Sequence, residues 1–376
     1  MTTQLRLASG NGPVSRTVLK TPPRDALPSD IPIIDVSGIF SDSLAARKTV
    51  ASQIRDAATN NGFFYIKNHG IAPSIPEAAR ERLLAFMRQP AEVKERAHIG
   101  QSKYFNGWKP PGSQRINPFE KVDVRETFSW TYDPRFDLSV QDGDDIPPHI
   151  ARYLRCEDFH WQATANLQGF QDAIVAYWRA CLALARALVR AFALSLDLDE
   201  DFFAEKFTHP DAALALNYYP PLPTPPSPTQ QKENDQEQGQ GKVKEQGEEE
   251  VSIGSHTDFQ LFTILWQDDA GGLQVLNREG QWLHARPVAD TFVVNMADYM
   301  QRITNGRYVS TVHRALNRNP VERVSMPFFF GFNLNESCGV LDSCVAEGEE
   351  KRYEEIACEE WVMRRARAMH TVDVET

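Results

Sequence analysis

Short apolar runs separated by turn residues characterise the chain from about residue 251 to residue 332. Examples are Leu261–Trp266, Phe292–Met296 and Val324–Phe332, each followed within two residues by Gly, Asn or Asp. Side chains of a strand alternate between two faces, and many short strands at regular spacing are typical of barrels and jelly rolls. We therefore predict a mainly β fold with flanking α-helices, whose core is a double-stranded β-helix, or jelly roll.

Helical periodicity dominates residues 158–196. Apolar side chains recur there at steps of three and four residues, as one face of an amphipathic helix requires. They are Leu167, Phe170, Ile174, Tyr177, Cys181, Ala185, Leu188 and Phe192. We predict one long helix from Asp158 to Leu196, packed against the barrel. Further helices are predicted from Asp42 to Asn60 and, as a charged amphipathic helix over the barrel, from Glu347 to Arg367.

Local composition divides the chain of 376 residues into segments. Residues 1–28 are polar and contain proline, which predicts poor order. An N-terminal region is expected over residues 29–155, and the jelly-roll core over residues 156–376. The core is interrupted at about 222–250 by a stretch rich in Gln, Glu and Gly. Because almost no apolar side chain is available there to offset the entropy of ordering, we predict a disordered insert.

Charge and cysteine usage limit the partners and the compartment. The formal net charge of −11 argues against nucleic acid or an anionic membrane as a partner. The five cysteines form no Cys-x-x-Cys pair, so we expect reduced thiols and no disulfide framework. No apolar run of about 18 residues is present to span a bilayer. These features predict a cytoplasmic protein, expected to be a monomer, whose ligand is a small molecule.

Metal-binding chemistry is indicated by a His-x-Asp pair that precedes the first apolar run. His256 and Asp258 are two residues apart, so in a strand their side chains point to one face. His313 follows Asp258 by 55 residues, across a region that we predict to form hairpins. Two imidazoles and one carboxylate on adjacent strands leave open positions on an octahedral metal, as in non-haem Fe(II) oxygenases. His69 and His284 are other histidines on predicted strands, which we expect to be structural.

A second pair of side chains on one face, Arg323 and Ser325, begins ten residues after His313. A guanidinium beside a hydroxyl matches a carboxylate, because both groups donate hydrogen bonds to it. With His-x-Asp, His and Arg-x-Ser in this order, the sequence resembles the isopenicillin N synthase-like family of Fe(II)- and 2-oxoglutarate-dependent oxygenases. Asn61–Gly70 resembles the N-terminal signature of that family, and 217–220, Asn-Tyr-Tyr-Pro, closely matches one of its strands.

The resemblance implies a dioxygenase that oxidises a small organic molecule. Fe(II) would be bound by His256, Asp258 and His313, with 2-oxoglutarate and O2 as cosubstrates. Succinate and CO2 would be released, and the substrate would be hydroxylated, desaturated or cyclised, in secondary metabolism. The metal and the cosubstrate carry the central step, so no further catalytic residue is expected.

The resemblance also assigns residues to the cosubstrate. Arg323, Ser325 and Tyr219 would bind the far carboxylate of 2-oxoglutarate, and Asn217 would face it. Ala215 is a departure from the pattern, because many relatives carry a basic residue two positions before this Asn. Two alternatives remain open. One is an iron-dependent oxidase that does not use 2-oxoglutarate, like isopenicillin N synthase or aminocyclopropane carboxylate oxidase, which also carry Arg-x-Ser. The other is a non-catalytic jelly-roll binding protein.

The substrate pocket is predicted beside the metal. Its expected lining comprises Phe259, Phe330, Phe332 and the segment Tyr104–Phe128. Three charged residues of that segment, Lys121, Arg125 and Glu126, are expected to form surface or scaffold ion pairs. An apolar pocket of this kind suits an aromatic, alkaloid or terpenoid-like molecule better than a sugar or nucleotide.

Overall fold

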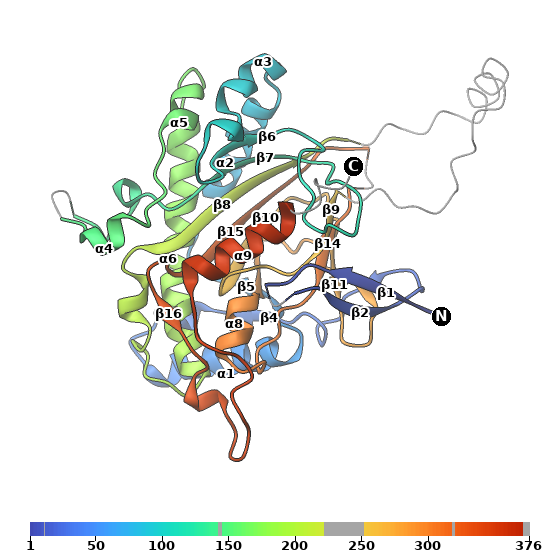
Figure 1. The fold of residues 1–376 in the computed structure, drawn as a ribbon, viewed down its shortest axis with the longest axis vertical. Coiled ribbons are helices and arrows are strands. Elements are labelled where there is room, and N and C mark those ends of the chain that lie inside the picture. The colour runs from blue at the N-terminus through green and yellow to red at the C-terminus, as the bar shows by residue number, and fades with distance from the viewer. Residues whose placement is uncertain (11, 142–144, 222–251, 318–319, 371–376) are drawn as a thin grey trace.

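Two β-sheets face each other at the centre of the molecule, and the long helices lie against the outer side of the larger sheet (Figure 1). This computed structural model describes residues 1–376 except 11, 142–144, 222–251, 318–319 and 371–376. The insert predicted at 222–250 lies outside the described residues. In the described part of the chain the large sheet has eight strands and the small sheet five. The prediction of a mainly β core with flanking helices is confirmed.

From β8 onward the chain passes back and forth between the two sheets. In spatial order, the large sheet consists of β4 (Ile33–Asp35), β5 (Phe63–Lys67), β13 (Phe292–Met296), β10 (Phe262–Gln267), β15 (Arg323–Asn333), β8 (Pro210–Tyr219), β7 (Glu126–Trp130) and β6 (Gly107–Lys109). The small sheet consists of β3 (Arg24–Asp25), β12 (Trp282–His284), β11 (Leu273–Leu276), β14 (His313–Ala315) and β9 (Ile253–His256). Two-stranded sheets are formed by β1 (Thr2–Leu7) with β2 (Val14–Leu19), and by β16 (Ser337–Cys338) with β17 (Ile356–Ala357).

Helices flank these sheets. They are α1 (Leu44–Asn60), α2 (Ser74–Met87), α3 (Ala91–Lys94), α4 (Pro148–Ala151), α5 (Phe159–Ala163), α6 (Phe170–Ser195), α8 (Asp298–Ile303) and α9 (Cys358–His370). The first agrees with the predicted helix at 42–60, and it begins after Ser43, whose side chain accepts a hydrogen bond from the Ala46 amide as an N-cap. None of the described helices is long and apolar enough to cross a membrane.

The helix predicted from Asp158 to Leu196 is divided in the structure. A short α5 is followed by a turn, and α6 begins only after Gly169, whose φ of 70° is a left-handed conformation that glycine adopts without steric cost. The predicted apolar stripe belongs to α6 and packs on the large sheet. There the Tyr177 hydroxyl donates a hydrogen bond of 2.8 Å to the Met326 carbonyl of β15.

The N-terminal residues, for which the sequence predicts poor order, instead form the hairpin β1–β2. Leu7 and Val18 are buried and pack on Leu276 and Trp282 of the small sheet. Figure 1 shows the hairpin beside β11. The short alternation of polar and apolar positions in 2–19 is the signal for these strands.

The strand β15 shows how one element serves both sides of the large sheet. Odd-numbered residues face the small sheet, and even-numbered residues face the helices. The first group is Arg323, Ser325, Pro327 and Phe329. The second group is Val324, Met326, Phe328, Phe330 and Phe332, all part of the helix-side core. The polar residues of this strand therefore lie between the sheets, and the helix-facing residues anchor it in the core.

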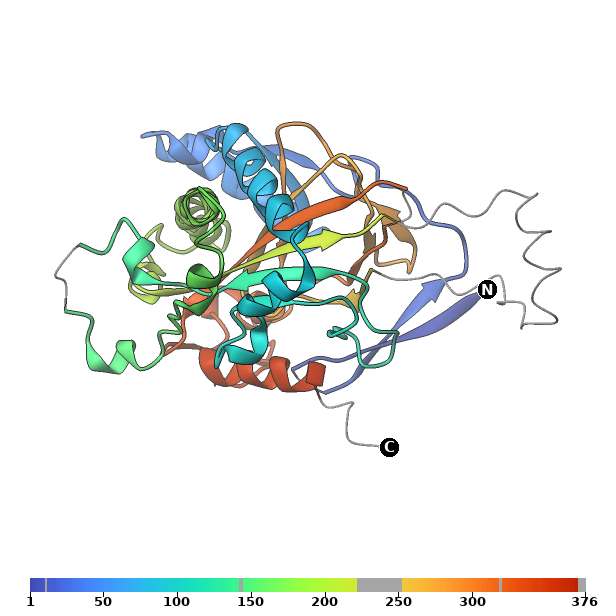
Figure 2. The same ribbon diagram turned by 90° about the horizontal axis from the view of Figure 1, so that it is seen from above.

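The C-terminal helix begins later than the predicted Glu347. β16 and β17 pair first, and α9 then runs from Cys358. Figure 2 shows α9 on the other side of the central strands from α2 and α6. In this position it closes the space between the two sheets, because its Val362 and Ala366 line the cavity there.

Candidate metal centre and substrate cavity

Three potential metal ligands meet between the two sheets. His256 ends β9 and His313 begins β14, and the two residues are direct cross-strand partners. Asp258 follows in the loop from β9 to β10. Its Oδ1 atom lies 3.7 Å from Nε2 of His256 and 3.7 Å from Nε2 of His313. One ligand atom from each residue lies within 4.8 Å of the others, so the three side chains that the sequence singles out do converge on one point.

The backbone fixes the orientation of both imidazole rings. Nδ1 of His256 lies 2.8 Å from the Gly254 carbonyl, and Nδ1 of His313 lies 3.1 Å from the Thr311 carbonyl. A carbonyl only accepts hydrogen bonds, so each Nδ1 carries the proton and each Nε2 presents its lone pair. Hydrogen bonds of this kind orient metal-binding histidines and raise their basicity.

The carboxylate of Asp258 is held by its outer oxygen. Oδ2 accepts hydrogen bonds from Thr263 Oγ1 at 2.5 Å and from Asn295 Nδ2 at 2.8 Å. These donors come from β10 and β13 of the large sheet, whereas both imidazoles belong to the small sheet. Oδ1 is therefore left to face the two Nε2 atoms. The sequence analysis missed both donors, because nothing in their local sequence links them to Asp258.

Burial controls the ionisation of this cluster. Burial, together with the neighbouring His313, lowers the pKa of His256 to about 3, so its ring is neutral near pH 7. Burial alone would raise the pKa of Asp258, but the adjacent imidazoles and the Asn295 and Thr263 donors hold it below its usual value. A neutral imidazole and an ionised carboxylate are the forms that bind a metal ion.

The helix α9 braces the loop that carries Asp258. Trp361 Nε1 donates a hydrogen bond of 2.6 Å to the Phe259 carbonyl, and Arg365 Nη2 donates one of 3.1 Å to the Thr257 carbonyl. The Arg365 guanidinium also lies 4.5 Å from the centre of the Phe259 ring. The residues on both sides of Asp258 are thus fixed by an element about a hundred residues downstream.

A buried arginine with an unused donor lies in the same cavity. Arg323 is 1 % exposed. Its Nε donates to the Gly271 carbonyl, and its guanidinium lies 4.4 Å from the centre of the Tyr219 ring, but its Nη1 has no hydrogen-bond partner. The Tyr219 hydroxyl lies 3.0 Å from Ser325 Oγ beside it. Leaving a buried donor unpaired is costly, and a carboxylate would satisfy the guanidinium and both hydroxyls.

Asn217 links this arginine end of the cavity to the opposite wall. Its Nδ2 lies 3.4 Å from Ser325 Oγ. Its Oδ1 accepts hydrogen bonds from Arg125 Nη1 at 2.5 Å and from Thr127 Oγ1 at 3.0 Å. The four residues that the sequence assigns to the cosubstrate therefore lie together. Arg125, which we expected in a surface or scaffold pair, lies inside the cavity.

The cavity has a volume of about 520 Å³ and contains the three potential ligands, the arginine end and the inner face of β7 and β8. Of the predicted lining, Phe259 and much of the segment 104–128 are confirmed. The prediction that Phe330 and Phe332 line the cavity is wrong, because both lie in the helix-side core against Phe207. Phe329 takes their place in the lining. This is the face that alternation from Arg323 and Ser325 requires.

Glu126 and the two other histidine candidates have structural contacts. Glu126 is buried and accepts hydrogen bonds from Lys94 at 2.5 Å and from Trp108 Nε1 at 2.8 Å, which agrees with the scaffold role expected of it. His69 Nδ1 accepts from the Ile71 amide. His284 lies near Gln274 and is not one of the three grouped ligands.

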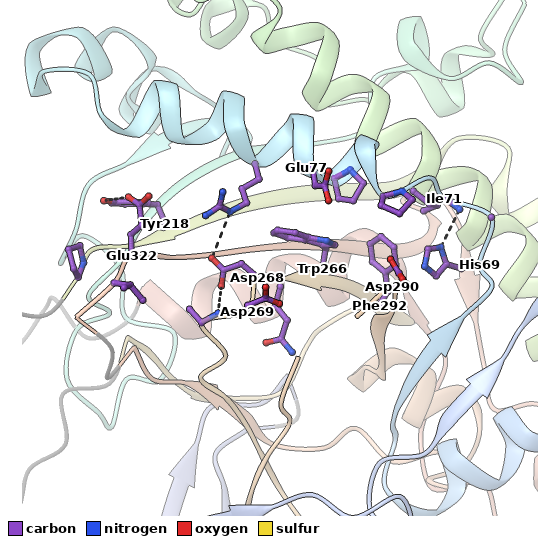
Figure 3. A pocket seen from close by; sticks show the side chains of 18 of the residues that line it. His69, Ile71, Glu77, Tyr218, Trp266, Asp268, Asp269, Asp290, Phe292 and Glu322 are labelled. Carbon is purple, nitrogen blue, oxygen red and sulfur yellow. Dashed lines mark hydrogen bonds and ion pairs between the residues drawn. The ribbon is translucent and has the colours of Figure 1, made fainter. Parts of the chain in front are cut away.

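A second, larger hollow lies outside the two sheets. It has a volume of about 1370 Å³ and is lined by residues of α2 and of the strand ends. Figure 3 shows Trp266 in its middle beneath α2, with His69 at one end and Glu322 at the other. Its two arginines are paired, Arg88 with Glu322 at 2.6 Å and Arg80 with Asp268 at 4.0 Å, and the group of potential metal ligands found among the described residues lies in the inner cavity. Its size therefore does not make it the better candidate.

Comparison with known proteins identifies the family. A family model described as the 2OG-Fe(II) oxygenase superfamily matches residues 210–332, and one described as the N-terminal part of the non-haem dioxygenase in morphine synthesis matches residues 31–149. The 2-oxoglutarate-Fe(II) type oxidoreductase ppzC of Metarhizium rileyi is 54% identical over 366 residues, which cover 97% of this chain and 94% of that protein. The chain belongs to the 2OG-Fe(II) oxygenase superfamily.

Further relatives of this 2OG-Fe(II) oxygenase agree. The 2-oxoglutarate-dependent dioxygenase citB of Monascus ruber is 30% identical over 357 residues, 92% of this chain and 97% of that protein. The crystal structure of a full-length Neurospora crassa protein in complex with alpha-KG and 5-formyluracil has a TM-score of 0.68 and 25% identity, and the match covers 90% of this chain and 96% of that one. The prediction of an Fe(II)- and 2-oxoglutarate-dependent dioxygenase with a double-stranded β-helix is confirmed, and small molecules are the typical substrates of its family.

Proposed function

We propose that His256, Asp258 and His313 bind the Fe(II) of this dioxygenase through Nε2, Oδ1 and Nε2. The observation that carries the proposal is the convergence of these three atoms. On each side chain the other polar atom, Nδ1 of the two histidines and Oδ2 of Asp258, is already held by a hydrogen bond. Such a ligand set binds one side of an octahedral ion and leaves the other side for exchangeable ligands. The neutral ring of His256 needs to lose no proton to bind.

The far carboxylate of 2-oxoglutarate then binds at Arg323. The unpaired Nη1 of Arg323 supports this assignment, as do the hydroxyls of Ser325 and Tyr219 beside it. Asn217 orients Ser325 through its Nδ2, because its Oδ1 is already engaged by Arg125 and Thr127.

Bound Fe(II) and 2-oxoglutarate supply the oxidising chemistry, with O2 consumed and succinate and CO2 released. The residues of this chain hold the reactants in one cavity, and α9 and the loop after Asp258 cover it. We place the substrate among small organic molecules of secondary metabolism. The fungal relatives and the size of the cavity support this assignment.

The test is an anaerobic titration of the metal-free protein with Fe(II) and then 2-oxoglutarate, followed by visible absorbance. We expect a weak charge-transfer band only when both are present, because the keto acid must chelate the metal. Asp258→Ala should give no iron binding, and Arg323→Ala should bind iron but require far more 2-oxoglutarate. His284→Ala is the matched control and should behave like the wild type. Iron binding without the band would instead favour an oxidase that does not use 2-oxoglutarate.

We further propose that the protein acts as a cytoplasmic monomer, without nucleic acid or membrane as a partner. The five cysteines are all free thiols, and three of them, Cys181, Cys344 and Cys358, are buried, which suits a reducing compartment. The net charge of −11 supports the absence of polyanionic partners. Sedimentation of the purified protein tests the monomer, and a dimer at micromolar concentration would contradict it.

A further inference from the structure

A row of polar side chains crosses four strands of the large sheet on the face that lines the cavity. Lys109 of β6 is paired with Thr127 of β7, Thr127 with Asn217 of β8, and Asn217 with Ser325 of β15. Paired residues of neighbouring strands point to the same side. Arg323, assigned above to 2-oxoglutarate, lies at the β15 end of this row. The chemistry at the β6 end is not used by that assignment.

The β6 end of the row contains a second buried arginine with an unused donor. Arg125 stands two residues before Thr127, so it points into the cavity, and it is only 8 % exposed. Its Nη1 donates to Asn217, and its Nη2 lies 3.5 Å from Asp123 Oδ2. Its Nε is buried and has no hydrogen-bond partner. An unpaired guanidinium nitrogen in a cavity is a donor available to a ligand.

Lys109 adds a second cation beside Arg125. Among the described residues, no hydrogen bond or ion pair engages its ammonium group, and it lines the same cavity. Burial, and then the like charge of Arg125, lowers the pKa of Lys109 to about 8. The site therefore disfavours the charged form of Lys109. An anion placed between the two cations would favour the charged form and raise the pKa of Lys109 again.

The charges at this end do not cancel. Among the described residues, Asp123 is the carboxylate that pairs with Arg125, and burial raises the pKa of its carboxyl group. Two cations against one carboxylate leave about one positive charge, which a monoanion would neutralise. The whole cavity lining is basic too, with six Lys and Arg side chains against three Asp. This contrasts with the net charge of −11 of the chain.

We propose that Arg125 and Lys109 bind a carboxylate of the organic substrate, so that this enzyme oxidises a small carboxylic acid. The proposal rests on the proposed function, in which 2-oxoglutarate occupies the Arg323 end. Neighbouring strands are about 4.8 Å apart, so the backbone of Lys109 lies three strand spacings, about 14 Å across the sheet, from that of Ser325. With one carboxylate of 2-oxoglutarate at the metal and the other at Arg323, neither is left for the β6 end. Phe259 and Phe329 provide apolar wall for the rest of the substrate.

The test compares small carboxylic acids with their neutral amides. Acetate, butanoate, benzoate and phenylacetate, each paired with its primary amide, are titrated into the anaerobic Fe(II)- and 2-oxoglutarate-loaded protein by calorimetry. We expect at least one acid to bind ten-fold or more tightly than its amide. Equal binding of acid and amide in every pair, or no binding of any acid, would overturn the proposal.

Variants assign the acid preference to its residues. Arg125→Gln should reduce it to less than two-fold, Lys109→Met should reduce it several-fold, and Arg125→Lys should keep part of it. Arg155→Gln is the matched control, because Arg155 lines the same cavity but lies near Asp211, and it should leave the preference intact. An acid preference that survives in both Arg125→Gln and Lys109→Met would contradict the proposal. If Arg125→Gln does not fold, Lys109→Met and Arg125→Lys decide.

Two readouts separate this proposal from the proposed function. The affinity for 2-oxoglutarate, followed by the charge-transfer band, should be unchanged in Lys109→Met, because Lys109 is separated from Ser325 by the strands β7 and β8, and a large loss would show that the β6 end binds the cosubstrate instead. The acid–amide comparison is repeated in Arg323→Ala, where the Arg323 end cannot hold an acid. The acid–amide comparison therefore gives a result even if the charge-transfer band never forms. In that case the proposed function fails, and the proposal that Arg125 and Lys109 bind a carboxylate is judged separately.

Discussion

The two hollows of this molecule differ in whether their side chains still have hydrogen-bonding or metal-binding atoms without a partner. The outer hollow, about 1370 Å³ in volume, is lined by two arginines that neighbouring carboxylates already pair, Arg88 with Glu322 and Arg80 with Asp268. The inner cavity, about 520 Å³, contains three converging ligand atoms and two arginines with unpaired nitrogens, Arg323 and Arg125. Unused binding capacity, and not volume, identifies the site.

The largest effect is expected from removing a ligand in the inner cavity. His256→Ala or Asp258→Ala should abolish both iron binding and turnover, because two ligands do not retain Fe(II) against solvent. Metal analysis after anaerobic loading and gel filtration measures the bound iron. Full activity of either variant would remove these residues from the metal centre.

The next effect concerns the cosubstrate. Arg323→Ala should weaken 2-oxoglutarate binding by about 2–4 kcal/mol, or about 30–1000-fold, because a buried charge pair loses one partner. Iron affinity should stay nearly the same. Titration of the charge-transfer band in both proteins gives the ratio, and an unchanged ratio would place the far carboxylate elsewhere.

A smaller effect is expected from the donors that hold Asp258. Asn295→Ala removes one of the two hydrogen bonds to Oδ2, and loss of such a partner lowers metal affinity by about 10–100-fold. Thr263→Val, which removes the other donor, should act in the same direction. Competition with a chelator measures both, and wild-type affinity in the two variants would show that Oδ2 needs no support.

Lys109→Met should stabilise the protein while it weakens acid binding. The pKa of Lys109 is lower in the folded protein, about 8, than its ordinary value of 10.5, so its charge costs the folded state below about pH 8. We expect a gain of about 1–2 kcal/mol near pH 7. The gain should shrink as the pH rises from 8 towards 10.5, where the lysine loses its proton in the unfolded chain too. Urea unfolding at pH 7 and pH 10 tests both the sign and its pH dependence.

The outer hollow should tolerate change with the smallest effect. His69→Gln loses the hydrogen bond from the Ile71 amide and an edge contact with Phe292, which we expect to cost about 1 kcal/mol of stability. Iron binding, cosubstrate affinity and turnover should stay within two-fold of the wild type. A strong loss of turnover in this variant would break the contrast between the two hollows.

Sequence motifs predicted the parts of the site that local pattern encodes. His256, Asp258 and His313, and also Arg323 with Ser325, stand in short motifs whose spacing fixes a common face. The choice of Phe330 in place of Phe329 was an error of register, which counting by twos from Ser325 would have avoided. The sequence also contained a signal that Arg125 lies in the cavity, because Arg125 is two residues before Thr127 and therefore shares its face of the strand.

Other parts depend on tertiary contacts that no local pattern contains. Asn295 reaches Asp258 from a strand 37 residues away in sequence. The same holds for the N-terminal hairpin, whose order comes from packing on Trp282 and its neighbours. The break before α6 needed only Gly169, but a glycine inside an apolar periodic stretch is weak evidence for a helix end.

The hydrogen bonds from α9 to the loop around Asp258 have a consequence for folding during synthesis. Arg365 Nη1 also donates a hydrogen bond of 2.5 Å to the Ala8 carbonyl, 357 residues earlier in the chain. The loop that presents Asp258 is therefore not fully braced until the ribosome has passed residue 365. Closing so long a loop is entropically costly and slow. A nascent chain that has already exposed its His-x-Asp motif must wait for the synthesis of α9, about a hundred residues later, before that motif acquires its final rigidity.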